Sequence, residues 1–210
     1  MTIKEALETV GGLSTPSKMP CFGYSIPAGH CITGSKLWSV PGTVCFDCYA
    51  RKGRYMFRNV REALERRFQS LHDPRWTESM AYLIKERKME YFRWHDSGDL
   101  QGVWHLSQIC EVARQTPKCS HWLPTRETRI VKAYLDEYWF GIPENLNVRI
   151  SAMAFDKSPP IRFARKYCLT VSGASSNGSH TCPAPDQGNS CGDCRECWDS
   201  KTFSISYQKH

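Results

Sequence analysis

Seven of the eleven cysteines fall into two groups, and this clustering constrains the fold more than any other feature of the chain. The tighter group is Cys182-x8-Cys191-x2-Cys194-x2-Cys197. Two-residue gaps place successive sulfurs on one side of a tight turn, where four thiolates satisfy one tetrahedral zinc or one [4Fe–4S] cube. Zinc ribbons usually use two separated pairs, so this run with one remote cysteine favours iron–sulfur.

The second group is Cys31-x13-Cys45-x2-Cys48. Three thiolates can hold a cube and leave one iron open to a ligand, and an open iron can bind and activate a substrate or cofactor. The alternative is a zinc site closed by Cys21 or His30 as the fourth ligand. On the sequence, Cys21 either completes this first site or stays free.

Composition decides between metal and disulfide chemistry for these thiols. We find no signal-peptide pattern and no apolar run near the roughly 20 residues that span a bilayer. We therefore expect a cytoplasmic protein without membrane contact, in which thiols stay reduced and clustered cysteines bind metal. Cys110, Cys119 and Cys168 lie in apolar helix or strand patterns, which predicts small buried core residues.

Strand and helix patterns alternate through the middle of the chain. Expected helices are 57–71, 77–87, 100–114 and 128–138, and expected strands are 91–94, 121–123, 146–150, 167–171 and 203–207. This alternation predicts an α/β protein with a parallel sheet. We expect a polar lead-in at 1–20, a core with the first cysteine group at 21–171, and a Cys-rich segment at 172–210.

Polar residues come immediately after the ends of three of the predicted strands. They are His95, Ser97, Gly98 and Asp99 after the first, Thr125, Arg126 and Glu127 after the second, and Ser151 after the third. Ligands bind at the carboxyl ends of parallel strands, so these side chains are predicted to converge on one cofactor site. Helix capping is the alternative for single members such as Ser97, Asp99 or Thr125, but it leaves the others unexplained.

Four segments together resemble a family of phage and mobile-element proteins that is similar to compact radical S-adenosylmethionine enzymes. They are Cys45-Phe46-Asp47-Cys48-Tyr49-Ala50, His95-Asp96-Ser97-Gly98-Asp99, Trp122-Leu123-Pro124-Thr125-Arg126-Glu127 and Cys191-Gly192-Asp193-Cys194-Arg195-Glu196-Cys197-Trp198. The resemblance spans roughly residues 19 to 207, and its cysteine motifs are the specific part.

The resemblance implies a fold of the partial (β/α) barrel type, a cofactor and a chemistry. Cys31, Cys45 and Cys48 would be ligands of an open [4Fe–4S] cluster, and S-adenosylmethionine would chelate the fourth iron through its methionyl groups. The turn at 97–99 would contact the methionine amino group. Reduction of the cluster would cleave the cofactor to a 5′-deoxyadenosyl radical that abstracts hydrogen from substrate. The C-terminal cysteines would hold an auxiliary cluster.

Two hypotheses follow. The first is a radical S-adenosylmethionine-like enzyme with one or two clusters and a reductant partner, in the host cytoplasm if the chain is phage-encoded. A phage context would make a nucleotide or nucleic acid a plausible substrate. The second is a non-catalytic iron–sulfur or zinc protein that binds nucleic acid or a protein partner. The formal charge of +7 does not choose between them, because bound thiolate clusters would lower it. No catalytic residue is assigned from the sequence.

Overall fold

Six parallel strands form one sheet in the computed structural model, which describes residues 1–209. The strands are β1 Phe22–Tyr24, β2 Tyr91–Trp94, β3 Ser120–Thr125, β4 Leu146–Ser151, β5 Thr170–Ser175 and β6 Ser204–Gln208. Their spatial order follows the chain, β1 to β6, and each strand pairs with the next in parallel. The predicted α/β class with a parallel sheet is confirmed. Sequential order is the topology of a partial (β/α) barrel.

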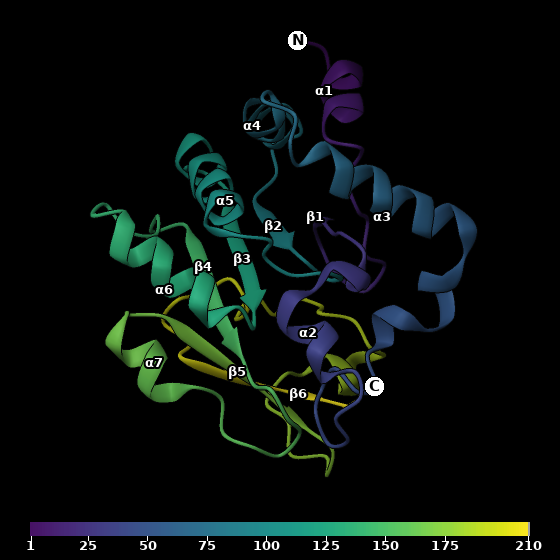
Figure 1. The fold of residues 1–210 in the computed structure, drawn as a ribbon, viewed down its shortest axis with the longest axis vertical. Coiled ribbons are helices and arrows are strands. Elements are labelled where there is room, and N and C mark those ends of the chain that lie inside the picture. Colours follow the sequence, from purple (N-terminus) through teal and green to yellow (C-terminus); the bar gives the residue numbers. More distant parts are fainter. Residues whose placement is uncertain (210) are drawn as a thin grey trace.

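Helices connect most of the strands. They are α1 Ile3–Thr9, α2 Ile32–Leu37, α3 Arg58–Ser70, α4 Trp76–Glu86, α5 Val103–Gln115, α6 Thr128–Glu137 and α7 Ile161–Lys166, with short 3₁₀ turns at Ala28–His30, Tyr49–Arg51, Gly53–Met56 and Ala184–Gln187. Figure 1 shows α4, α5, α6 and α7 following one another along the outside of the sheet. Each returns the chain to the start of the next strand, as parallel pairing requires.

The two faces of the sheet carry different chemistry because side chains alternate along a strand. Phe92 and Trp94 are fully buried on the helix-covered face, and Trp94 packs against Trp76 of α4 at 6.0 Å between ring centroids. Arg93 points to the opposite, inner face, where its guanidinium lies 4.5 Å from the ring centroid of Trp122. The apolar core therefore lies between the sheet and the helices that cover its outer face, and the inner face of the sheet is polar and aromatic.

The C-terminal Cys-rich segment covers part of this inner face. Fully buried Arg149 of β4 donates to the carbonyl oxygens of Val171 at 2.8 Å and Thr202 at 3.0 Å, and to those of Phe203, Glu196 and Asp199. The indole Nε1–H of Trp198 donates to the carbonyl of Phe92 at 2.9 Å. These bonds attach residues 196–203 to the middle of the sheet.

The N-terminal lead-in contains α1, whose start is fixed by a capping box between Thr2 and Glu5 and which buries Ala6. Two expectations are wrong in detail. The strand predicted at 167–171 begins only at Thr170, because α7 and a left-handed residue at Cys168, φ +53, occupy the preceding positions. Cys168 is exposed at that turn, not buried, whereas Cys110 and Cys119 are buried as predicted.

Within residues 1–209, none of the helices is long and apolar enough to span a membrane.

Candidate cofactor and metal site

A cavity of about 320 Å³ lies at the carboxyl ends of the strands and is lined by both cysteine groups. Its wall includes Cys31, Cys45 and Cys48, three of the C-terminal cysteines (Cys182, Cys191 and Cys197), and six of the eight predicted cofactor-binding residues (His95, Ser97, Gly98, Asp99, Arg126 and Ser151). The predicted convergence of the strand ends is therefore present.

Gly34 of α2 makes room for the first cysteine group. A Cβ built at Gly34 would lie 2.9 Å from Cβ of Cys31 and 3.6 Å from the Sγ atoms of both Cys31 and Cys45. The two sulfurs therefore lie within about 7 Å of each other, with the bare glycine Cα facing the space between them. A side chain at this position would fill the space that a metal group needs.

The thiol of Cys31 is influenced by one acidic group, two further thiols and one arginine. Burial raises the pKa of the Cys31 thiol, Asp99, Cys48 and Cys45 raise it further, and Arg126 opposes them. The pKa of Cys45 is likewise raised by burial, with Arg126 opposing. Thiolates are the form that binds metal, so a positively charged metal group would relieve the cost of holding these three sulfurs together.

Neither expected fourth ligand of a closed zinc site lies with this group. His30 stacks on Phe68 with 3.7 Å between ring centroids, and its Nε2 is 3.4 Å from a carboxylate oxygen of Glu65. Cys21 does not line the cavity, and its pKa is raised to about 12 by burial and then by Cys191 of the other group. In the part of the chain that the structure describes, the first group is thus three thiols, the number that leaves one iron of a cube open.

The turn after β2 is fixed against the end of β1. Ser97 donates its hydroxyl to the carbonyl of Ile26 at 3.0 Å, and the Ile26 N–H donates to the carbonyl of Ser97 at 3.1 Å. Gly98 has φ +85, and a Cβ there would lie 2.2 Å from Cγ1 of Ile26. Only glycine therefore fits, and the turn presents its backbone to the cavity.

Asp99 joins this turn to the end of β3. Its carboxylate accepts from the Thr125 hydroxyl at 2.5 Å and from the N–H groups of Arg126 at 2.9 Å and Leu100 at 2.8 Å. Burial raises the Asp99 pKa to about 6, although these three hydrogen bonds lower it. A carboxylate has about four acceptor positions, so one remains for a donor in the cavity.

Arg126 supplies the positive charge on this side of the cavity. Its Nε–H donates to the carbonyl of Ala152 at 3.0 Å, which fixes the guanidinium beside β4. Ser151, at the end of β4, is buried and accepts at 3.3 Å from the hydroxyl of Ser172. This side of the cavity therefore offers a fixed guanidinium, able to bind a carboxylate through two parallel N–H bonds, together with the carboxylate of Asp99.

Thr125 and Glu127 lie behind the cavity wall. The hydroxyl of Thr125 is bonded to Asp99, and the buried Glu127 accepts from Thr33 through its backbone N–H at 2.6 Å and its hydroxyl at 2.8 Å. Thr33 is in the first turn of α2, two residues after Cys31 at the N-cap. Glu127 thus holds the Cys31 helix against the end of β3, a positioning role that the sequence pattern did not reveal.

His95 is the strained residue of the site. It has φ +54, is buried, and lines the cavity, and burial followed by Arg93 lowers its pKa to about 3. Neither ring nitrogen has a hydrogen-bond partner in the described chain. Its ring packs edge-on against that of His105 of α5, with 5.2 Å between the ring centroids. Strained, unpaired polar groups cluster at functional sites, so His95 stays a candidate site residue.

The C-terminal cysteines approach the same cavity from the other side. Cys191 is anchored by its N–H to the carbonyl of Lys18 at 3.1 Å, and Cys194 N–H donates to the carbonyl of Cys191 at 3.0 Å. The Sγ of Cys197 is 3.3 Å from the Tyr207 hydroxyl, and burial raises its pKa to about 11. Cys194 is the one member of this group outside the cavity wall.

Several cavity residues were missing from the sequence-based set. Arg93, Trp38, Asp96 and Tyr207 all line the cavity, and Asp96 accepts from the Tyr55 hydroxyl at 2.8 Å. For Arg93 the sequence offered a signal: an arginine between Phe92 and Trp94 in a strand has to point to a polar space, which here is the cavity. Trp38 and Tyr207 gave no such signal.

No set of three or more His, Cys, Asp or Glu side chains within residues 1–209 is arranged to hold a single metal ion. A tetrahedral zinc at about 2.3 Å from each sulfur would bring its sulfurs within about 3.8 Å of one another. A cube places four irons between its ligands and spaces the sulfurs more widely. The metal assignment stays a prediction.

A model of the gene product 88 family matches residues 2–200. The chain belongs to the gene product 88 family. This designation is of the phage type, in line with the phage part of the resemblance, and carries no statement about metal or reaction. No curated protein matches the chain, and no solved structure matches it.

Proposed function

We propose that this member of the gene product 88 family is an iron–sulfur enzyme similar to the radical S-adenosylmethionine enzymes, acting in the host cytoplasm. One observation carries the proposal: a single cavity at the strand ends is lined by three thiols, the 97–99 turn and Arg126. Ligand sites of parallel α/β folds lie at these strand ends. Cys31, Cys45 and Cys48 would hold a [4Fe–4S] cluster, with Gly34 leaving the space beside them.

The protein's own groups would bind and orient the cofactor. Arg126 would bind the methionyl carboxylate, and Asp99 would accept from the methionyl ammonium with its remaining acceptor position. Glu127 would keep Cys31 in place through α2. When bound, cluster and S-adenosylmethionine would supply one-electron reductive chemistry that side chains lack, with the electron from an external reductant.

The C-terminal group would hold an auxiliary cluster. Cys182, Cys191, Cys194 and Cys197 supply its thiols, and Arg149 fixes their segment on the sheet. Cys21, whose thiol interacts electrostatically with that of Cys191, would be a further candidate ligand for this group.

Metal analysis of protein purified without oxygen tests the two cysteine groups. About eight irons per chain, with matching acid-labile sulfide, are expected for two cubes. Cys48→Ser and Cys194→Ser should each lower the iron content by about four. Cys168→Ser is the control, because Cys168 is exposed and outside both groups, and should leave iron unchanged. Colourless protein containing zinc would end the enzyme proposal and favour a zinc binding module.

Equilibrium dialysis with S-adenosylmethionine tests the cofactor site separately. Arg126→Ala should lose at least tenfold in affinity at unchanged iron content, because it removes a charge-assisted bidentate contact. Arg129→Ala, which removes an exposed arginine three residues later on α6, should change neither quantity. Equal cofactor affinity in the two variants would contradict the assignment of Arg126.

A further inference from the structure

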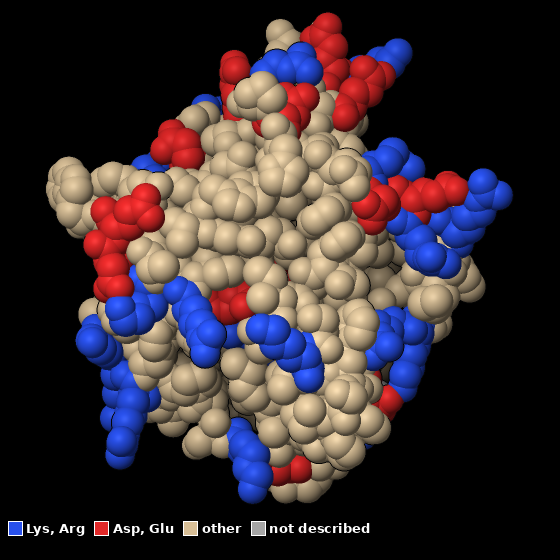
Figure 2. Space-filling model, in the orientation of Figure 1, with Lys and Arg blue, Asp and Glu red and all other residues tan. Residues whose placement is uncertain are grey.

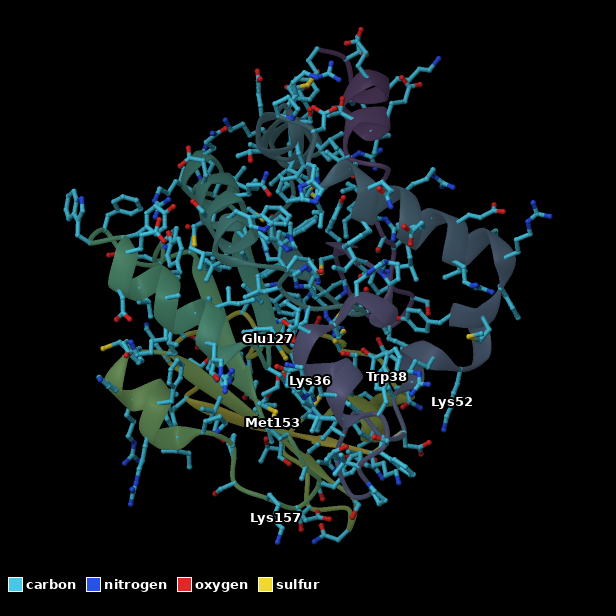
Figure 3. All side chains as sticks on the ribbon, in the orientation of Figure 1. Lys36, Trp38, Lys52, Glu127, Met153 and Lys157 are labelled. Carbon is cyan, nitrogen blue, oxygen red and sulfur yellow. The ribbon has the colours of Figure 1, made fainter. Side chains whose placement is uncertain are left out.

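A strip of positive side chains runs from α2 to the start of α3. We use the name basic strip for Lys36, Trp38 and residues 51–61. Positions 51–61 carry the exposed cations Arg51, Lys52, Arg54, Arg58 and Arg61, and no Asp or Glu. Figure 2 shows blue side chains gathered over α2 and the segment after it, and Figure 3 shows Lys36, Trp38 and Lys52 on the same face of the molecule.

Most of this charge is not neutralised within the chain. Lys52 pairs with Asp47, and Arg58 pairs with Glu62 at 2.7 Å. In the described residues, no carboxylate lies within ion-pair distance of Arg51, Arg54 or Arg61. Exposed cations without partners attract a polyanion and release its counterions on binding.

The strip begins at the rim of the cavity. The guanidinium of Arg51 lies 3.8 Å from the ring centroid of Trp38, and Trp38 lines the cavity. Ala50, the residue before Arg51, also lines it. A chain-like anion bound along the strip would therefore pass the opening of the proposed active site.

Apolar side chains stand between the cations. Phe57 is 58% exposed and Met56 is 53% exposed, directly before Arg58 at the start of α3. A solvated helix face has no need of an exposed phenylalanine, whereas unpaired bases stack on such rings. Alternation of cations with exposed apolar and aromatic groups is the pattern of single-strand binding surfaces.

We propose that the basic strip binds single-stranded nucleic acid and presents one of its nucleotides to the cavity. Trp38 belongs both to the strip and to the cavity wall, so a strand held along the strip would pass directly by the cavity. The inference rests on the proposed function only for the role of the cavity, since charge and stacking on the strip do not depend on a cluster.

Fluorescence anisotropy with a labelled 20-nucleotide dT strand, its RNA equivalent and a 20-base-pair duplex tests the proposal between 50 and 200 mM salt. The test variant is Arg51→Ala/Arg54→Ala/Arg61→Ala. The control is Lys4→Ala/Lys85→Ala/Lys118→Ala, which removes three exposed cations on α1, on α4 and before β3. Iron content is measured on the same samples.

The wild type and the control should bind a single strand more tightly than the duplex. The test variant should lose at least tenfold in affinity at 50 mM salt, and its slope of log K against log salt should be shallower by about 2. Phe57→Ala should weaken single-strand binding about fivefold or more without changing that slope. The DNA and RNA arms identify the kind of strand.

Equal losses in the two triple variants would overturn the proposal, and so would equal or tighter binding of the duplex. Binding only to vesicles of anionic phospholipid, run in parallel, would overturn it in favour of a membrane surface. Loss of strand binding in the test variant at full iron content supports the strip. If the wild-type protein is colourless but still binds single strands, the iron–sulfur proposal is refuted while strand binding by the basic strip is supported.

Discussion

Gly98→Ala tests whether the cavity turn is built on close contact with β1. Gly98 and Gly178 both have φ +85, a left-handed conformation that costs an L-residue about 1–2 kcal/mol. They differ in surroundings: nothing lies within 4 Å of a Cβ at Gly178, whereas at Gly98 it would lie 2.2 Å from Cγ1 and 2.8 Å from the carbonyl oxygen of Ile26. Comparing alanine substitutions at the two glycines therefore separates the free-energy cost of the left-handed backbone from the cost of the steric clash with Ile26.

The clash is expensive because Ile26 cannot move. Its side chain is fully buried, and its N–H and carbonyl are both bonded to Ser97. Overpacking of a rigid site costs about 1–3 kcal/mol. Gly178→Ala should thus lower the free energy of unfolding by about 1–2 kcal/mol, and Gly98→Ala by about 2–5 kcal/mol.

Urea unfolding followed by tryptophan fluorescence measures both variants at matched iron content, and a change in midpoint at constant m reports stability. Gly98→Ala should also weaken S-adenosylmethionine binding, because a displaced turn moves the Asp99 carboxylate, while Gly178→Ala should not. Equal destabilisation by the two substitutions would refute the reasoning, since it would mean that the turn can retreat from Ile26.

Three further predictions concern residues around the site. Arg149→Met should lower the free energy of unfolding by about 3 kcal/mol or more in urea melts, because it removes the charged hydrogen bonds that attach residues 196–203 to the sheet; an unchanged midpoint would contradict this. Burial lowers the pKa of His121 from 6.5 to about 3. Between pH 6.5 and pH 3 the unfolded chain therefore binds a proton at His121 that the folded chain does not, and the free energy of unfolding decreases as the pH is lowered. From pH 6.5 to 5 the wild type should lose about 2 kcal/mol more than His121→Phe in the same melts, and parallel curves would contradict it. Glu127→Ala should lower iron per chain by freeing α2, and Glu127→Gln, which keeps the acceptor for the Thr33 N–H, should restore most of it; full iron in both would remove Glu127 from the support of Cys31.

Local patterns predicted the elements whose periodicity is strong. The strand Tyr91–Trp94 has the predicted bounds, α3 is shorter than predicted by one residue at each end, and α6 ends one residue early. Their apolar spacing reflects a buried face that any parallel fold needs. Alternation of strand and helix was enough to predict the parallel sheet. The short helices α1 and α7 gave too few turns for periodicity to be visible.

The two cysteine groups and the strand-end polar residues could be recognised without a structure, since both are patterns of spacing along the chain. Their common position could not: residues 31–48 and 182–197 face one cavity because strand pairing and the Arg149 hydrogen bonds bring them together. The tertiary structure also separated neighbours in sequence: Arg126 faces the cavity, whereas Glu127 turns away to Thr33. Adjacent side chains leave the backbone in different directions, and the packing of α2 against β3 selects which of them reaches a ligand.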